Sequence, residues 1–292
     1  MSITGCVLES VDDTVEPGPS DQRVPLTSGR FLRYDSSMEI MEMLLASIPL
    51  VLILCAGIFV QSAAGFAAGL TIVPALLWCG YSIPAAQCSL LVATIPQNVW
   101  GVWSLRESLQ AREVIWPGLG RLVFFPLGVW GLLHVERLET QTVRQIVGGV
   151  LVVLTLAIMA FRPQPRQSLH PLWAWLAFPI SGFLQGLVGM GGPAMVFWVQ
   201  AHDWGTRKTR AFLFSMYLIS LVPALLVLAL VFGTRILSAG IVSAMIIPVL
   251  LVVTHYGLIF GTQLGRQRLR RVTFGLLLVM GIAGLLAPWI TG

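Results

Sequence analysis

Two sets of five apolar segments, separated by a polar stretch, make up most of the chain. The segments are 43–62, 66–79, 84–103, 114–134 and 145–161 in the first set, and 172–188, 190–201, 210–232, 237–260 and 272–290 in the second. A helix that crosses a bilayer needs about 20 apolar residues, and most of these segments come close to that length. The alternation that marks a membrane β-strand is absent. The pattern therefore predicts an all-α polytopic membrane protein built from two repeats of about five transmembrane segments each.

Composition sets the boundaries of the predicted parts. The chain is 56% hydrophobic and 11% charged, whereas a soluble domain carries about 25% charged residues. Residues 1–38 are polar and acidic and lack the basic start and apolar core of a signal peptide, so we expect a disordered N-terminal tail. The first repeat then covers 39–161, a linker rich in proline, arginine and glutamine covers 162–171, and the second repeat covers 172–292.

The second segment of each repeat is short. Residues 66–79 make roughly 21 Å of helix at 1.5 Å per residue, less than the ~30 Å core of a bilayer. Residues 190–201 make a helix that is shorter still. Each segment is either a short crossing or a re-entrant half-helix.

Basic residues between the segments favour ten crossings, because alternate loops then share a side and one side receives eleven bases against three. The eleven are Arg106, Arg112, Arg162, Arg166, Arg207, Lys208, Arg210, Arg266, Arg268, Arg270 and Arg271, and the three are Arg137, Arg144 and Arg235. By the positive-inside rule the eleven face the cytoplasm, and both termini lie outside. An odd number of segments in each half makes the halves run in opposite directions, which predicts two inverted-topology repeats.

Each repeat carries a glycine-containing interruption at a corresponding place. The second, residues 185–193, has four glycines and a proline. The first, residues 61–69, lies 124 residues earlier and aligns Gly65 with Gly189. Glycine costs about 1 kcal/mol relative to alanine inside a helix, and proline about 3 kcal/mol, so both stretches predict helix breaks. The glycines serve either close packing of helices or a break that lines a cavity.

Paired breaks in inverted repeats indicate a transporter's binding site near the midplane of the membrane. Free backbone N–H groups and the positive end of the next helix attract an anion, and glycine, above all Gly189 and Gly191, lets it approach the backbone. The predicted substrate-binding residues come from the breaks and from polar positions nearby: Gln61, Gly65, Phe66, Gly69, Gln97, Asn98, Arg121, Gln185, Gly189, Met190, Gly191, Gly192, Ser215 and Tyr217. The alternative for the polar side chains is a hydrogen bond between helices. The alternative for Arg121 is that it extends to the cytoplasmic interface instead of facing the cavity.

Acidic residues are absent from the apolar segments after Glu42. Carboxylates inside a membrane usually carry protons or cations, so this absence favours an anion pathway. A membrane-embedded enzyme would need a nucleophile–base pair or a ligand cluster, but the four histidines are scattered and match no metalloprotease pattern. We therefore expect a transporter with no catalytic residues, metal, cofactor or nucleic-acid partner. A non-transporting assembly factor is a further alternative, and the sequence is compatible with a homo-oligomer.

The repeated break motif, the core 189–193, the short segment after it and the start of the next helix resemble the TauE/SafE family of sulfite or sulfonate exporters. The resemblance covers roughly 43–290 in layout and is specific around 58–98 and 181–220. It implies a multi-pass carrier in a bacterial-type inner (cell) membrane that exports small sulfur oxyanions or organosulfonates. The first half departs from the family's glycine-rich pattern at Ala67 and Ala68, which makes close backbone approach less easy there.

Overall fold

A computed structural model describes residues 36–64, 67–160, 169–264, 274–275 and 277–286. The chain divides into two units, 1–41 and 42–292, and the account below concerns the second. The predicted tail, 1–38, lies outside the described residues except for its last three, which are helical. Most of the predicted linker, 162–171, also lies outside them.

Every described segment of regular structure is helical, as the sequence predicts. The α-helices are α1 (Ser36–Ala64), α2 (Ala68–Trp78), α3 (Ile83–Leu105), α4 (Ala111–Val135), α5 (Thr140–Ala160), α6 (Pro171–Val188), α7 (Gly192–Gln200), α8 (Thr206–Phe232), α9 (Leu237–Met245) and α10 (Ile247–Leu264). Two 3₁₀ turns, η1 (Arg106–Ser108) and η2 (Gly233–Ile236), join α3 to α4 and α8 to α9, and residues 277–286 are helical again. Among the described residues, four stretches are long and apolar enough to cross a membrane: Ala111–Val135, Thr140–Ala157, Pro171–Val188 and Arg207–Met245.

The segment predicted at 237–260 is two helices instead of one, because α9 ends at Met245 and α10 begins at Ile247. Pro248 contributes to the division, because it has no N–H to donate to the carbonyl of Ala244 and its ring crowds that carbonyl. A proline alone does not impose a break, since α4 continues through two of them.

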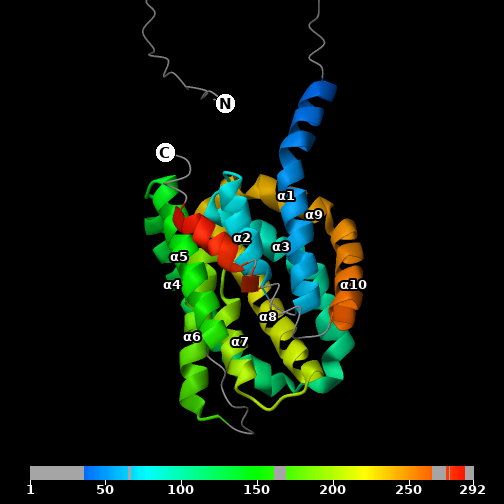
Figure 1. The fold of residues 1–292 in the computed structure, drawn as a ribbon, viewed down its shortest axis with the longest axis vertical. Coiled ribbons are helices and arrows are strands. Elements are labelled where there is room, and N and C mark those ends of the chain that lie inside the picture. The colour runs from blue at the N-terminus through cyan, green and yellow to red at the C-terminus, as the bar shows by residue number, and fades with distance from the viewer. Residues whose placement is uncertain (1–35, 65–66, 161–168, 265–273, 276, 287–292) are drawn as a thin grey trace, which may run out of the picture. The chain divides into compact units, whose positions relative to one another are not determined.

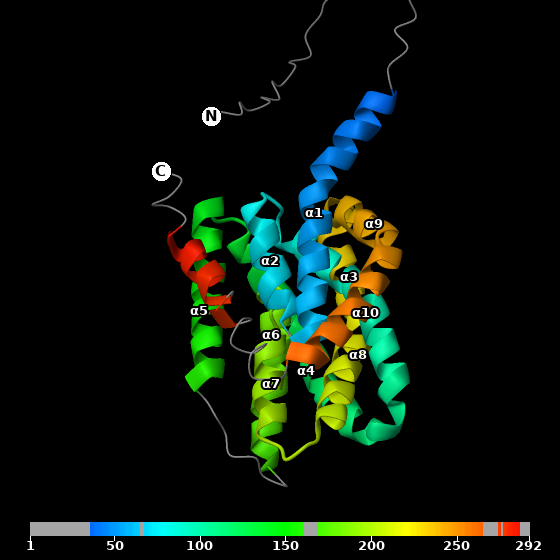
Figure 2. The ribbon, with the colours of Figure 1, turned by 45° about the vertical axis from the view of Figure 1, so that its right-hand side comes forward.

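The two short helices turn back beside their predecessors. Figures 1 and 2 show α2 running antiparallel to α1, and α7 running antiparallel to α6. With 11 and 9 residues, α2 and α7 are roughly 16 and 14 Å long at 1.5 Å per residue, about half of a ~30 Å bilayer core. Each pair is a helical hairpin, and the residues described at its turn, Ala67 in the first and 189–191 in the second, are buried.

Five of the described connections gather at two ends of the bundle. The α3–α4 and α7–α8 connections lie at one end, and the α2–α3, α4–α5 and α8–α9 connections lie at the other (Figures 1 and 2). At the first end, Lys208 and Glu113 form an ion pair of 2.6 Å that ties the start of α8 to the start of α4. Most of the described basic loop residues therefore share one end.

Glycines bring two pairs of helices into close contact. Between α4 and α6, a Cβ at Gly182 would meet the carbonyl oxygen of Arg121, and one at Gly186 would meet that of Phe125. Gly182 and Gly186 form the small-xxx-small pattern that lets membrane helices approach each other. Between α5 and helix 277–286, a Cβ at Gly148 would lie 2.9 Å from the Cα of Gly284. The first of these contacts fixes the position of Arg121.

Candidate functional site

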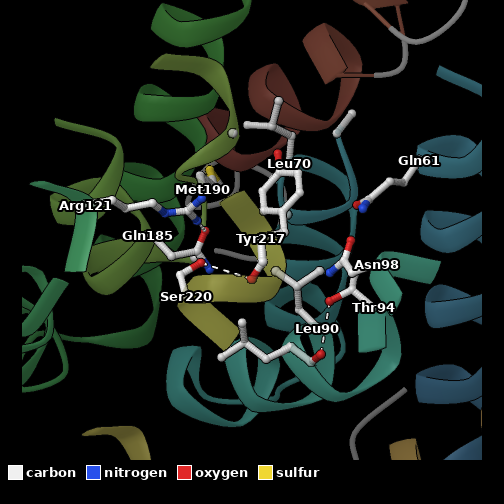
Figure 3. Close-up of a pocket in the computed structure, with 15 residues that line it drawn as sticks. Gln61, Leu70, Leu90, Thr94, Asn98, Arg121, Gln185, Met190, Tyr217 and Ser220 are labelled. Carbon is white, nitrogen blue, oxygen red and sulfur yellow. Dashed lines mark hydrogen bonds between the residues drawn. The ribbon is translucent and has the colours of Figure 1, made fainter. Parts of the chain in front are cut away.

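One cavity lies where the two interrupted stretches meet, and it holds about 490 Å³ of space unfilled by protein, part of it open to solvent. Its lining comes from seven helices and from the breaks between them: Gln61, Ala67, Gly69, Leu70, Leu90, Leu91, Thr94, Asn98, Arg121, Gln185, Gly189, Met190, Gly192, Tyr217 and Ser220. Figure 3 shows Arg121, Gln185 and Met190 on one side of Tyr217, with Gln61, Asn98 and Thr94 on the other. The wall is thus polar at several points and carries one charge.

The break between α6 and α7 is built around a left-handed residue. Gly189 has φ +72°, a conformation that glycine adopts at little cost. Its N–H donates to the carbonyl of Gln185 at 3.0 Å, and the N–H of Met190 donates to that of Leu184 at 3.3 Å. The bond to Gln185 is that of an αL cap, and together the two bonds close the last turn of α6, so the chain leaves the helix at a fixed angle.

Side chains of α6 hold the residues that follow. The N–H of Gly191 donates to Oε1 of Gln185 at 3.1 Å, and the hydroxyl of Ser181 donates to the carbonyl of Gly191 at 2.6 Å. A Cβ at Gly191 would lie 2.5 Å from the Ser181 carbonyl oxygen. Gly191 is therefore packed against α6 and does not line the cavity, whereas its neighbour Gly192 does.

The first break places a non-glycine residue in the left-handed region. Ala67 precedes α2 with φ +95°, and its carbonyl accepts from the N–H of Thr71 at 3.0 Å. Gly65 and Phe66, two predicted site residues, lie outside the described residues. Gly69, in the first turn of α2, is packed directly against the carbonyl oxygen of Gly189. The two interruptions are therefore in contact.

Arg121 is the charged residue of the cavity, and its side chain is 1% exposed. Its guanidinium donates to Sδ of Met195 at 3.0 Å and to Oε1 of Gln185 at 3.3 Å, and it lies 5.3 Å from the centre of the Tyr217 ring. Its Nε has no partner among the described residues. The interpretation in which Arg121 reaches the interface is wrong, because the backbone of Arg121 is held against Gly182 and the side chain points inward (Figure 3).

No negatively charged group among the described residues compensates the guanidinium of Arg121. A thioether, an amide oxygen and an aromatic ring are its contacts among the described residues, and the lining contains no carboxylate. A buried charge is costly unless an opposite charge or strong hydrogen bonds compensate it. An anion in the cavity would supply that compensation.

The remaining predicted residues divide by their position on the helices. Asn98 and Tyr217 line the cavity, while Ser215 is half-buried outside it. Gln97 is 2% exposed, away from the lining, and neither atom of its amide has a partner among the described residues. Thr94, one turn before Asn98, lines the cavity but is not among the residues predicted from the sequence.

Ser220 was missed as well, three positions after Tyr217. Positions three and four apart lie on one face of a helix. Thr94 and Ser220 could therefore have been predicted as the polar residues one turn away from Asn98 and Tyr217 on the same helix faces. The apolar lining residues Leu70, Leu90 and Leu91 carried no comparable signal.

Comparison with known proteins gives one family. The family model described as sulfite exporter TauE/SafE matches residues 50–284, a range that contains the whole cavity lining. No match was found among curated proteins or among solved structures.

Proposed function

Because the chain belongs to the sulfite exporter TauE/SafE family of membrane transporters for small sulfur-containing anions, we propose that it exports sulfite and organosulfonates. The substrate binds in the cavity between the two breaks, near the midplane of the membrane. The repeats 39–161 and 172–292 have inverted topology, and each contributes one break. No catalytic residue, metal or cofactor takes part in this function.

The observation that carries the proposal is the buried guanidinium of Arg121, which has no acidic partner among the described residues. Two unit charges 4 Å apart interact by about 4 kcal/mol at an effective dielectric constant of 20. That energy corresponds to roughly a thousandfold in affinity. Arg121 is thus the residue expected to dominate anion binding.

Neutral donors complete the site. The oxygens of a sulfite or sulfonate group accept hydrogen bonds, and the amide groups of Gln61 and Asn98 and the hydroxyl of Tyr217 offer donors around the cavity. Gly192, at the start of α7, presents backbone to the same space. Leu70 and Leu90 provide an apolar side, which suits the carbon part of an organosulfonate.

Export needs no coupling ion. An inside-negative membrane potential is worth about 2.3 kcal/mol per charge per 100 mV, and for an anion this term favours exit. Uptake against it would require a cation to move with the substrate. No carboxylate lies among the lining residues to hold one, so movement driven by the potential is the simplest mechanism.

Counterflow in proteoliposomes tests the function. Vesicles loaded with unlabelled sulfite should transiently accumulate labelled sulfite through the wild-type protein. Arg121→Gln should lower this exchange by two orders of magnitude or more, and Arg121→Lys should lower it less because it keeps the charge. Arg106→Gln, which removes an exposed arginine outside the cavity, is the matched control and should exchange normally. Absence of wild-type exchange, or full exchange by Arg121→Gln, would overturn the proposal.

A further inference from the structure

A second cavity lies between α2, α5 and helix 277–286, away from the first. It holds about 190 Å³ of space unfilled by protein, part of it open to solvent. Its walls are apolar or glycine except for one arginine, and they include Pro74, Leu77, Trp78, Arg144, Gly148 and Gly284. Leu77 and Trp78 of this lining end α2, and the α2–α3 connection lies at the end of the bundle that the sequence predicts to face outside (Figures 1 and 2).

Arg144 is half-buried and is the charged residue of this lining. Its Nε is buried and has no hydrogen-bond partner among the described residues. Although Glu136 and Glu139 precede it in the α4–α5 turn, Arg144 forms no ion pair with a described residue. Its guanidinium instead lies 5.9 Å from the centre of the Trp78 ring, close enough for a cation–π contact that orients the group.

We propose that Arg144 and Trp78 form a second anion-binding site, which takes the oxyanion group of a small sulfonate or sulfate. A guanidinium matches such a group with paired hydrogen bonds, and the surrounding apolar wall strengthens the attraction. A phospholipid headgroup offers the same chemistry from another source, and the experiment below separates the two.

The position of the second site relates it to transport. Leu70 lines the first cavity, and Pro74 and Leu77 line the second. Positions four and seven residues apart share one face of a helix, and they rise by roughly 6 and 10 Å along it. The second site thus lies one to two turns of α2 beyond the first, toward the predicted outer end, and we assign it to the exit side of the transport path. This exit role rests on the proposed function, whereas the binding itself does not.

Tryptophan fluorescence of the purified, lipid-depleted protein can report binding, because an anion on Arg144 changes the group that lies against Trp78. Methanesulfonate is the first probe and a short-chain phosphatidylglycerol the second. Methanesulfonate should produce a saturable change in emission in the wild type and in Arg121→Gln. Trp78→Phe should lose that change, and Arg144→Gln should weaken binding at least about tenfold, as expected for a lost charged hydrogen bond. Arg144→Lys should fall between.

Each result decides a separate question. An unchanged response in Arg144→Gln overturns the site, as does the absence of any Trp78-dependent response in the wild type. A response to phosphatidylglycerol alone assigns the cavity to a lipid and overturns the exit role. If the wild type fails to exchange sulfite while Arg144→Gln still loses the methanesulfonate response, the proposed function fails and the second site stands.

Discussion

Two neighbouring glycines should respond to the same substitution in opposite ways. An added Cβ at Gly191 would lie 2.5 Å from the Ser181 carbonyl oxygen and 2.7 Å from the Gln185 Cβ, separations that real Cβ atoms do not show. An added Cβ at Gly192 would lie 2.8 Å from the Tyr217 hydroxyl and 4.0 Å from the ring carbon that bears it. The first contact involves backbone, which cannot turn aside, and the second involves the end of a movable side chain.

The magnitudes follow from these contacts. Overpacking of this kind costs about 1–3 kcal/mol, so Gly191→Ala should lose about 2 kcal/mol of stability. That loss corresponds to a fall in unfolding temperature of roughly 4–8 °C on the scale for domains of this size. Gly192→Ala lies in the first turn of α7, where alanine favours the helix, and should stay within about 1 kcal/mol of the wild type. It narrows the cavity, and loss of one hydrogen bond to a charged group, about 1.5–3 kcal/mol, should weaken substrate binding roughly 10- to 100-fold.

Two measurements on the same preparations check this pair: thermal unfolding in detergent, and counterflow of labelled sulfite after reconstitution at equal protein. Gly120→Ala is the control, since its Cβ would make an ordinary contact of 3.7 Å with Phe178. It should behave like the wild type in both assays. Wild-type transport by Gly192→Ala would refute the location of the substrate, and wild-type stability of Gly191→Ala would refute the packing role of Gly191.

Four further outcomes are expected. Gly182→Ala should lower the unfolding temperature and the transport rate together, because its Cβ meets the carbonyl oxygen of Arg121; preserved transport would contradict this. Ala67→Gly should raise stability by about 1 kcal/mol in thermal unfolding, since glycine relieves a positive φ. Methanesulfonate should compete with labelled sulfite better than sulfate does, because one guanidinium balances one negative charge. Efflux from vesicles made negative inside with potassium and valinomycin should rise with the potential, and efflux that follows only a pH gradient would contradict uncoupled export.

The apolar pattern was sufficient to locate the helices, because a chain in a bilayer must satisfy its backbone hydrogen bonds within each segment. It failed at 237–260, where hydrophobicity is continuous but the helix is divided at Ile246. It also could not decide whether residues 66–79 and 190–201 were full-length segments. In the structure α2 and α7 are half-length and turn back beside α1 and α6 (Figure 1), an arrangement that depends on tertiary packing.

Site residues within the breaks could be predicted from the sequence, whereas those on the regular helices were harder to predict. Gly189 follows from the interruption, since a left-handed turn there calls for glycine. Asn98 and Gln97 are adjacent in α3, yet only Asn98 lines the cavity, because successive residues point about 100° apart on a helix that is packed on several sides. The inward position of Arg121 depends on Gly182, 61 residues later, which no local pattern relates to it.

The charge of the cavity links these observations to the choice of substrate. At each break the negative end of one helix lies next to the positive start of the following one, so their dipoles largely offset each other. The positive charge of Arg121 then remains, and its contacts with the Gln185 amide oxygen and the Tyr217 ring stabilise it only in part. A singly charged sulfonate or hydrogen sulfite makes the occupied cavity neutral, whereas a doubly charged anion leaves a net negative charge in a medium of low dielectric constant. The site should therefore discriminate between anions first by their charge. The apolar wall should then discriminate between anions of equal charge by their size and shape.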